Sequence, residues 1–118
     1  MVANNATPLA LLVALLAGCG GFPPPNDRLA ATVAAARSAR ELGAPNSPQA
    51  ALHLKLADEE LASAKGLMTD GKNERASYVL LRAKADAELA LALAKQNSAK
   101  AETQQVQEQI KTLQGGNP

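Results

Sequence analysis

Two side chains in this sequence could carry chemistry, and each is the only one of its kind. Cys19 is the single thiol and His53 is the single imidazole among 118 residues. A thiol can accept a covalent group, and an imidazole can transfer protons or bind a metal. Whether either forms a site depends on the residues around it.

The neighbours of His53 do not complete a site. A partner on the same helix would stand three or four residues away, and Leu56 and Ala57 occupy those positions. The acidic run 58–60, with Lys55 four residues before Glu59, is typical of a solvated helix face. We expect a partly exposed His53, no catalytic residue, no metal and no cofactor.

Cys19 follows a segment with the features of an export signal. All 23 charged side chains lie at or after Asp27, and residues 9–17 form an uninterrupted apolar run. This run spans about half of a hydrocarbon core of roughly 30 Å, which suits a signal peptide rather than a transmembrane helix. We expect residues 1–18 to be a signal peptide.

The four residues Leu16, Ala17, Gly18 and Cys19 resemble a bacterial lipobox. The resemblance implies cleavage before Cys19 by signal peptidase II, after the thiol has received a diacylglycerol. Residues 1–8 contain no Lys or Arg, unlike the usual start of such a signal, so the true start codon stays open. The alternative is a secreted or soluble protein in which Cys19 is incidental.

The residues after Cys19 bear on location. Gly20 stands where Asp would favour retention in the inner membrane, so the resemblance implies an outer-membrane lipoprotein facing the periplasm. Residues 19–26 are then the lipidated cysteine and a tether. Its glycines and three prolines would hold the domain within about 20–25 Å of the bilayer.

The composition predicts an all-α domain. Alanine (26) and leucine (18) dominate, Trp is absent, and Tyr and Phe occur once each. Alanine and leucine favour helices, whereas aromatic and β-branched residues, which favour strands, are scarce. The net charge of +1 creates no field that would select nucleic acid, so we expect no such partner.

Turn residues divide the mature chain into helices. Asp27 and Ser47 are candidate N-caps, Gly43 closes the first helix, and Gly71 separates the second from the third. The expected helices are 27–42, 48–68 and 73–113, in an Ala-rich domain at 27–114 that is followed by a disordered tail at 115–118. We predict a small three-helix bundle or helical hairpin with a long C-terminal helix.

Apolar spacing predicts the buried faces. In the second helix the expected stripe comprises Leu54, Ala57, Leu61, Ala64 and Met68, broadened by Leu52, Leu56 and Leu67. The third helix has one apolar row at Tyr78, Leu81, Ala85, Leu89 and Ala92, and another on the opposite side at Leu80, Ala83, Ala87, Leu91 and Ala94. We expect Tyr78 to anchor the core with its hydroxyl at the rim.

The third helix is longer than its partners, since no Gly or Pro interrupts residues 72–114. Two rows fit the core places of a coiled-coil heptad, namely Leu89, Gln96, Thr103 and Ile110, and Ala92, Ala99, Val106 and Leu113. We expect a partner-helix surface at Ala92, Ala99, Val106, Ile110 and Leu113. The alternative is a solvated helix that frays after Asn97.

Three sequence features carry a family resemblance. They are Ala44-Pro45 leading to Leu52, the turn at Gly71, and the run Ala85-Asp86-Ala87-Glu88-Leu89-Ala90. They are similar to bacterial lipoproteins of the "domain of unknown function" family numbered forty-three ninety-eight. The resemblance covers about residues 27–100. It implies a small Ala-rich helical domain behind a lipobox, and it implies no catalytic residues.

Together these patterns favour a lipid-anchored cell-envelope protein that is not an enzyme. We expect it to be a structural or protein-interaction module, with the membrane as one partner and a protein, or a second copy, on the third helix. The first alternative is a periplasmic helical module that binds a small ligand or lipid between Ala-rich helices. A metal-dependent enzyme at His53 is a further alternative.

Overall fold

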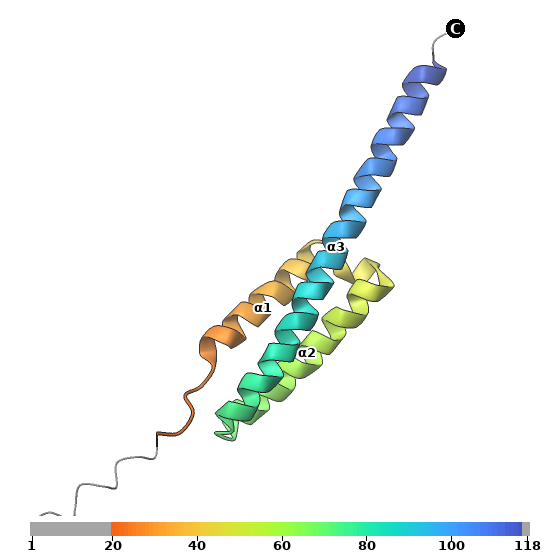
Figure 1. The fold of residues 1–118 in the computed structure, drawn as a ribbon. Coiled ribbons are helices and arrows are strands. Elements are labelled where there is room, and N and C mark those ends of the chain that lie inside the picture. Colours follow the sequence, from red (N-terminus) through yellow and green to blue (C-terminus); the bar gives the residue numbers. More distant parts are fainter. Residues whose placement is uncertain (1–19, 117–118) are drawn as a thin grey trace, which may run out of the picture.

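The computed structural model describes residues 20–116, which form an all-α fold (Figure 1). Its elements are α1 (Asn26–Glu41), the short 3-10 helix η1 (Ala44–Asn46), α2 (Pro48–Thr69) and α3 (Asn73–Gly115). The predicted fold class, three helices with a long C-terminal one, is confirmed. Helix α3 is the central helix of the bundle. It packs extensively against both α1 and α2, whereas α1 and α2 contact each other less.

Two glycines end the first two helices, as their positions predict. Gly43 has φ 82° and Gly71 has φ 74°, both in the left-handed region that side chains with a Cβ avoid. After α2 the backbone N–H of Lys72 donates to the carbonyl of Leu67 at 2.8 Å, and that of Gly71 donates to Met68 at 3.0 Å. This pair of bonds is a Schellman motif, which satisfies carbonyls that the helix end leaves free.

The helix starts differ from the predicted caps. Helix α1 begins at Asn26, so Pro25 stands in the N-cap position and Asp27 lies within the first turn. There the carboxylate of Asp27 still faces the positive end of the helix dipole. Ser47 does precede α2, with Pro48 at its first position, but the Ser47 side chain makes no capping hydrogen bond.

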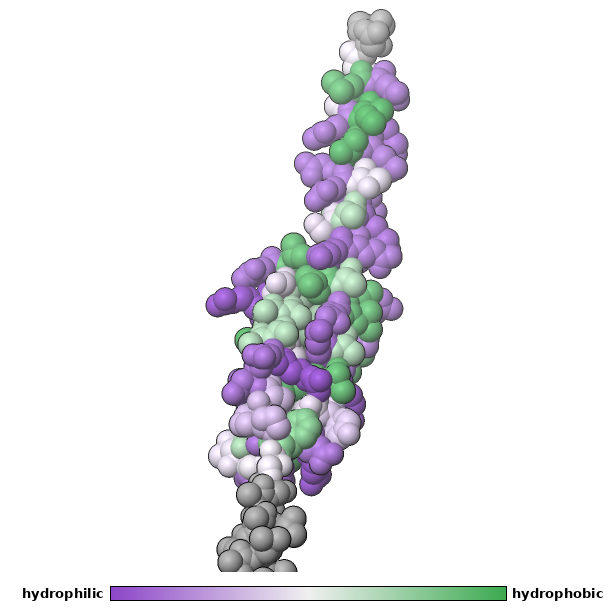
Figure 2. Space-filling view, turned by 60° about the vertical axis from the view of Figure 1, so that its left-hand side comes forward, coloured by the Kyte–Doolittle hydropathy of each residue, from purple (hydrophilic) through white to green (hydrophobic). Residues whose placement is uncertain are grey.

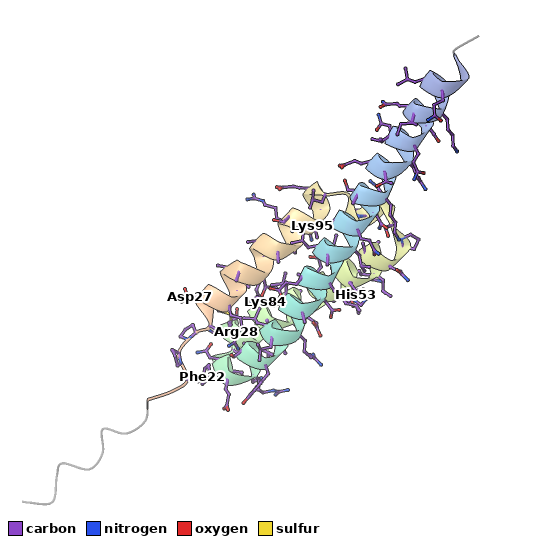
Figure 3. All side chains as sticks on the ribbon, turned by 45° about the horizontal axis from the view of Figure 1, so that its top comes forward. Phe22, Asp27, Arg28, His53, Lys84 and Lys95 are labelled. Carbon is purple, nitrogen blue, oxygen red and sulfur yellow. The ribbon has the colours of Figure 1, made fainter. Side chains whose placement is uncertain are left out.

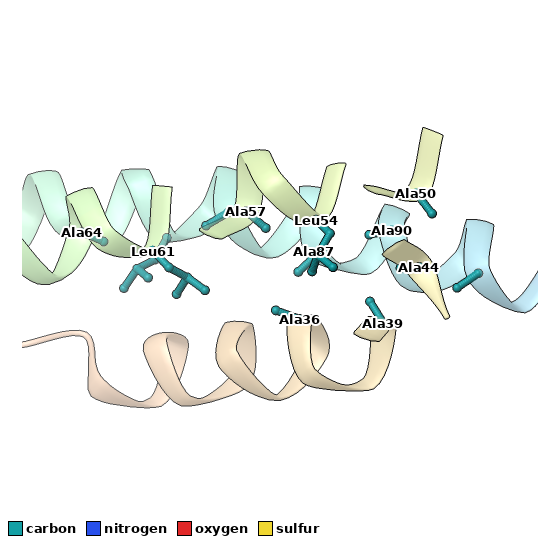
Figure 4. Packing of buried hydrophobic residues seen from close by; sticks show 13 residues of the cluster. Ala36, Ala39, Ala44, Ala50, Leu54, Ala57, Leu61, Ala64, Ala87 and Ala90 are labelled. Carbon is teal, nitrogen blue, oxygen red and sulfur yellow. The ribbon is translucent and has the colours of Figure 1, made fainter. Parts of the chain in front are cut away.

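Alanine fills most of the core (Figure 4). Among residues 20–116, eleven of the fourteen buried apolar residues are alanines, and Leu54, Leu61 and Leu80 are the others. A methyl group occupies little space, so the three helix backbones can approach closely. Each alanine also buries little apolar area, so the hydrophobic stabilisation per residue is small.

Several large apolar side chains expected in the core lie outside it. Leu52 is 54% exposed and Leu56 is 37% exposed, so they do not broaden the buried face of α2. Tyr78 is 64% exposed, and the prediction that it anchors the core is wrong. The buried row of α3 is the opposite one, which contains Leu80, Ala83 and Ala87.

Polar contacts join the helices around this thin core. The Arg28 guanidinium of α1 donates to the carbonyl oxygen of Ser77 on α3 at 3.0 Å. Between α2 and α3, His53 Nδ1 lies 2.7 Å from Asp86 Oδ1, and Glu60 pairs with Arg82 at 3.1 Å. The remaining contact, between Arg40 and Asp58, joins α1 to α2. Each such contact fixes the relative position of two helices.

Candidate interaction surface

The C-terminal half of α3 leaves the bundle and continues as a single helix (Figure 1). Every residue of the range 95–116, which we call the tail, is exposed. At 1.5 Å per residue its helical part is about 30 Å long. The predicted long C-terminal helix is confirmed, since α3 is helical as far as Gly115 rather than fraying after Asn97.

Large apolar side chains persist along the outer part of the tail, beyond Ala101, where α3 has left the end of α1 and the start of α2 behind. Val106 is 53% exposed, Ile110 is 47% exposed and Leu113 is 79% exposed. Figure 2 shows hydrophobic side chains gathered along the far part of α3, among hydrophilic ones. Ala92 and Ala99, the other predicted members of this surface, are exposed as well. Isolated exposed apolar residues are common, but a continuous row on one helix face indicates an interaction surface.

The same row continues back along the bundle. Tyr78, Ala85 and Leu89 precede Ala92 at spacings of seven, four and three residues, and all are exposed. At 100° per residue they lie on the opposite side of α3 from Leu80 and the buried alanines. We call the whole row from Tyr78 to Leu113 the outer stripe. The part of the outer stripe that lies along the bundle is one of the two apolar rows that the sequence shows on the third helix. Apolar spacing alone does not reveal that this row, rather than the other, is the exposed one.

One of the two polar residues of the outer stripe, Thr103, is internally satisfied. The Thr103 hydroxyl donates to the carbonyl of Ala99, one turn earlier, at 2.8 Å. Its methyl group is therefore available for apolar contact without leaving an unpaired donor. Thr103 interrupts the stripe less than its polarity suggests.

The lipobox residues Leu16, Ala17, Gly18 and Cys19 lie outside the described residues. The segment that follows is held to the bundle, since the Asn73 side-chain amide donates to the carbonyl oxygen of Phe22 at 3.0 Å. Asn73 begins α3, so this segment reaches the bundle at the end opposite to the tail (Figures 1 and 3). Because Phe22 is already bound to the bundle, the free part of the expected tether is shorter than the seven residues 20–26.

A surface hollow of about 530 Å³ lies where this segment meets α1 and α3. Its lining includes Phe22, Arg28, Ser77 and Lys84, and the labelled members cluster at the same end in Figure 3. It is open to solvent and lies outside the alanine core. The interfaces between the Ala-rich helices are filled instead, since Ala57, Ala83 and Ala87 are 0% exposed.

His53 sits on α2 with its side chain 27% exposed and faces Asp86 of α3. Sequence spacing could not identify this partner, which lies on another helix 33 residues away. Within residues 20–116, no three His, Cys, Asp or Glu side chains gather in a group that could hold a metal ion. None of the helices in that range has the length and apolar character needed to cross a bilayer.

Comparison with known proteins agrees with the features of the bundle. A search of curated proteins found no match, and a search of solved structures found none either. One family model, described as Domain of unknown function (DUF4398), matches residues 27–106. The match begins in the first turn of α1, covers the whole bundle and extends into the tail. The chain therefore belongs to the DUF4398 family, as its Ala-Pro opening, Gly71 turn and Ala-Asp-Ala-Glu-Leu-Ala run indicate.

Proposed function

We propose that this chain is a lipid-anchored cell-envelope protein, not an enzyme, which binds a protein partner through the outer stripe. The observation that carries the proposal is the tail itself. It holds Val106, Ile110 and Leu113 in water on one helix face, with nothing else in the described chain against them. Burial of a fully exposed side chain of this kind contributes roughly 1.5–3 kcal/mol. Val106 and Ile110 still have about half of their surface to bury, so each would contribute about 1 kcal/mol to binding a matching partner surface.

The arrangement of the two ends supports this role. The N-terminal segment reaches the bundle beside Asn73, and the tail leaves from the opposite end. An acylated Cys19 would thus anchor one end, on the outer membrane in the proposed location, and direct the tail into the periplasm. Acyl chains give firm attachment without a spanning helix when more than one chain is present.

The anchor is tested by mass. The full chain and a Cys19→Ala variant are expressed in a bacterium, and the intact mass of the membrane-fraction protein is measured. We expect a protein that begins at Cys19 with added acyl chains, absent from the variant. An unmodified soluble product from the unaltered chain would refute the anchor while leaving the bundle intact.

The interaction is tested by comparing cross-linking from two different faces of the tail helix. A photo-crosslinking amino acid is placed in living cells at Thr103, on the outer stripe, and separately at Glu108, which faces another side of the same helix. We expect a discrete higher-mass adduct from position 103 and little from position 108. Equal adducts at both positions, or none at either, would refute the outer stripe as a binding surface.

A further inference from the structure

The outer stripe changes character along the tail. Its half nearer the bundle carries small or polar side chains, at Gln96, Ala99 and Thr103, and its outer half carries large apolar ones, at Val106, Ile110 and Leu113. All six are exposed. A partner helix that fits this surface must therefore be large where the tail is small and small where it is large.

A second copy of the tail meets this requirement when it runs in the opposite direction. In the register that overlaps both tails fully, each layer joins one small or polar residue to one large one. The layers are Gln96 with Leu113 of the second copy, Ala99 with Ile110, Thr103 with Val106, and the three symmetry-related pairs. In a parallel pair Ala99 would face Ala99 and Thr103 would face Thr103. Those layers leave unfilled space, which costs stability.

Charge favours the same direction. In a parallel heptad pair the flanking positions place Lys95 of one helix against Lys100 of the other, twice over. Like charges at such positions are destabilising. The antiparallel pair instead places Lys100 against Gln107, and Glu102 against Gln109, so these flanking pairs bring no like charges together.

The bundle leaves room for this second helix. The end of α1 and the start of α2 approach α3 at Leu42 and Pro48, on the side that carries Asn97 and Ala101. The outer stripe lies on the other side of the tail at 100° per residue. A helix along the stripe would therefore pass the bundle of its partner without displacing η1 or α2.

We propose that two copies of this chain associate through their tails as an antiparallel helix pair centred between Gln104 and Gln105. This proposal rests on the proposed function only in its use of the outer stripe, and it does not require the anchor. It would place the two copies of Asn73, and with them the two N-terminal segments, about 90 Å apart. The dimer would thus be a rod with one attachment point at each end.

Disulfide trapping tests the direction of pairing. The full chain carries Cys19→Ala, and single cysteines are introduced by Glu102→Cys, Gln107→Cys and Gln109→Cys, which leave the stripe and both lysines intact. Differently tagged variants are co-expressed in pairs and oxidised mildly. We expect a cross-linked dimer from the 102 and 109 variants and none from the 102 and 107 variants. Cross-linking of 102 with 107, which is the parallel geometry, or no cross-linking of either pair, would overturn the proposal.

A charge in the stripe supplies the control. Val106→Asp with Ile110→Asp should abolish the 102–109 cross-link, whereas Leu52→Asp, at a comparably exposed apolar residue of α2, should leave it unchanged. A cross-link that survives the paired Asp substitutions would overturn the proposal. If the tail forms a face-specific adduct with a different protein and no cross-link with itself, this proposal fails and the proposed function stands.

Discussion

Ala87 and Leu89 stand two positions apart on α3, and the smaller side chain is the buried one. Ala87 is 0% exposed, whereas Leu89 is 43% exposed on the opposite side of the helix. Alanine at position 87 lets α3 approach α2 and α1 closely, and leucine at position 89 belongs to the outer stripe. The large side chains of α3 thus lie mainly on its outer face, where a partner could bury them.

Enlarging a buried alanine should therefore destabilise the bundle. Ala87→Leu inserts a branched side chain between closely packed backbones, and we expect a loss of about 1–3 kcal/mol in the free energy of unfolding. Ala85→Leu, two residues earlier on the exposed face, should change it by less than about 0.5 kcal/mol. Urea denaturation followed by circular dichroism measures both. Equal losses would show that the assignment of faces on α3 is wrong.

The contact between His53 and Asp86 should couple α2 to α3. Both side chains are about a quarter exposed, and the contact of 2.7 Å joins groups 33 residues apart. We expect His53→Ala and Asp86→Ala each to lower the free energy of unfolding by about 1 kcal/mol. The double variant should lose less than the sum of the two, because both substitutions break one contact. Strict additivity in thermal or urea denaturation would mean that the pair contributes nothing in solution.

Two glycines should respond to alanine with opposite signs. Gly71 has φ 74° in the turn after α2, so Gly71→Ala should cost about 1 kcal/mol. Gly66 lies inside α2, and a Cβ there would meet no atom within 4 Å, so Gly66→Ala should stabilise by about 0.5–1 kcal/mol. The thermal unfolding midpoints of the two variants, compared with that of the unaltered chain, test both expectations. A stabilised Gly71→Ala variant would refute the left-handed turn.

Local signals predict the helices of this chain well. Gly43, Pro48 and Gly71 act through the backbone of their own turn, so the helix boundaries lie within one or two residues of those expected. The long uninterrupted course of α3 follows equally from the absence of Gly and Pro after Lys72. Information of this kind needs no knowledge of distant neighbours.

The choice of buried face is a different matter. Both apolar rows of α3 have helical spacing, and the row with Tyr78 and Leu89 contains larger side chains than most of the row that is buried. The large apolar side chains of that row therefore led to the incorrect prediction that Tyr78 is buried. The close approach of the three helix backbones determines which row is buried, because a tight helix–helix interface accommodates alanine and excludes tyrosine. The contacts between His53 and Asp86 and between Arg28 and Ser77 likewise depend on tertiary neighbours, which spacing along one helix does not reveal.

The central claim is that the tail serves association rather than the stability of the bundle. The most direct test compares the molar mass and unfolding midpoint of the full chain, carrying Cys19→Ala, with those of the same chain lacking residues 99–118. We predict a particle larger than one chain for the first, a single chain for the second, and closely similar unfolding midpoints for the two bundles at low concentration. A clearly lower unfolding midpoint after the deletion would contradict the central claim, and an unchanged oligomer size would contradict self-association through the tail.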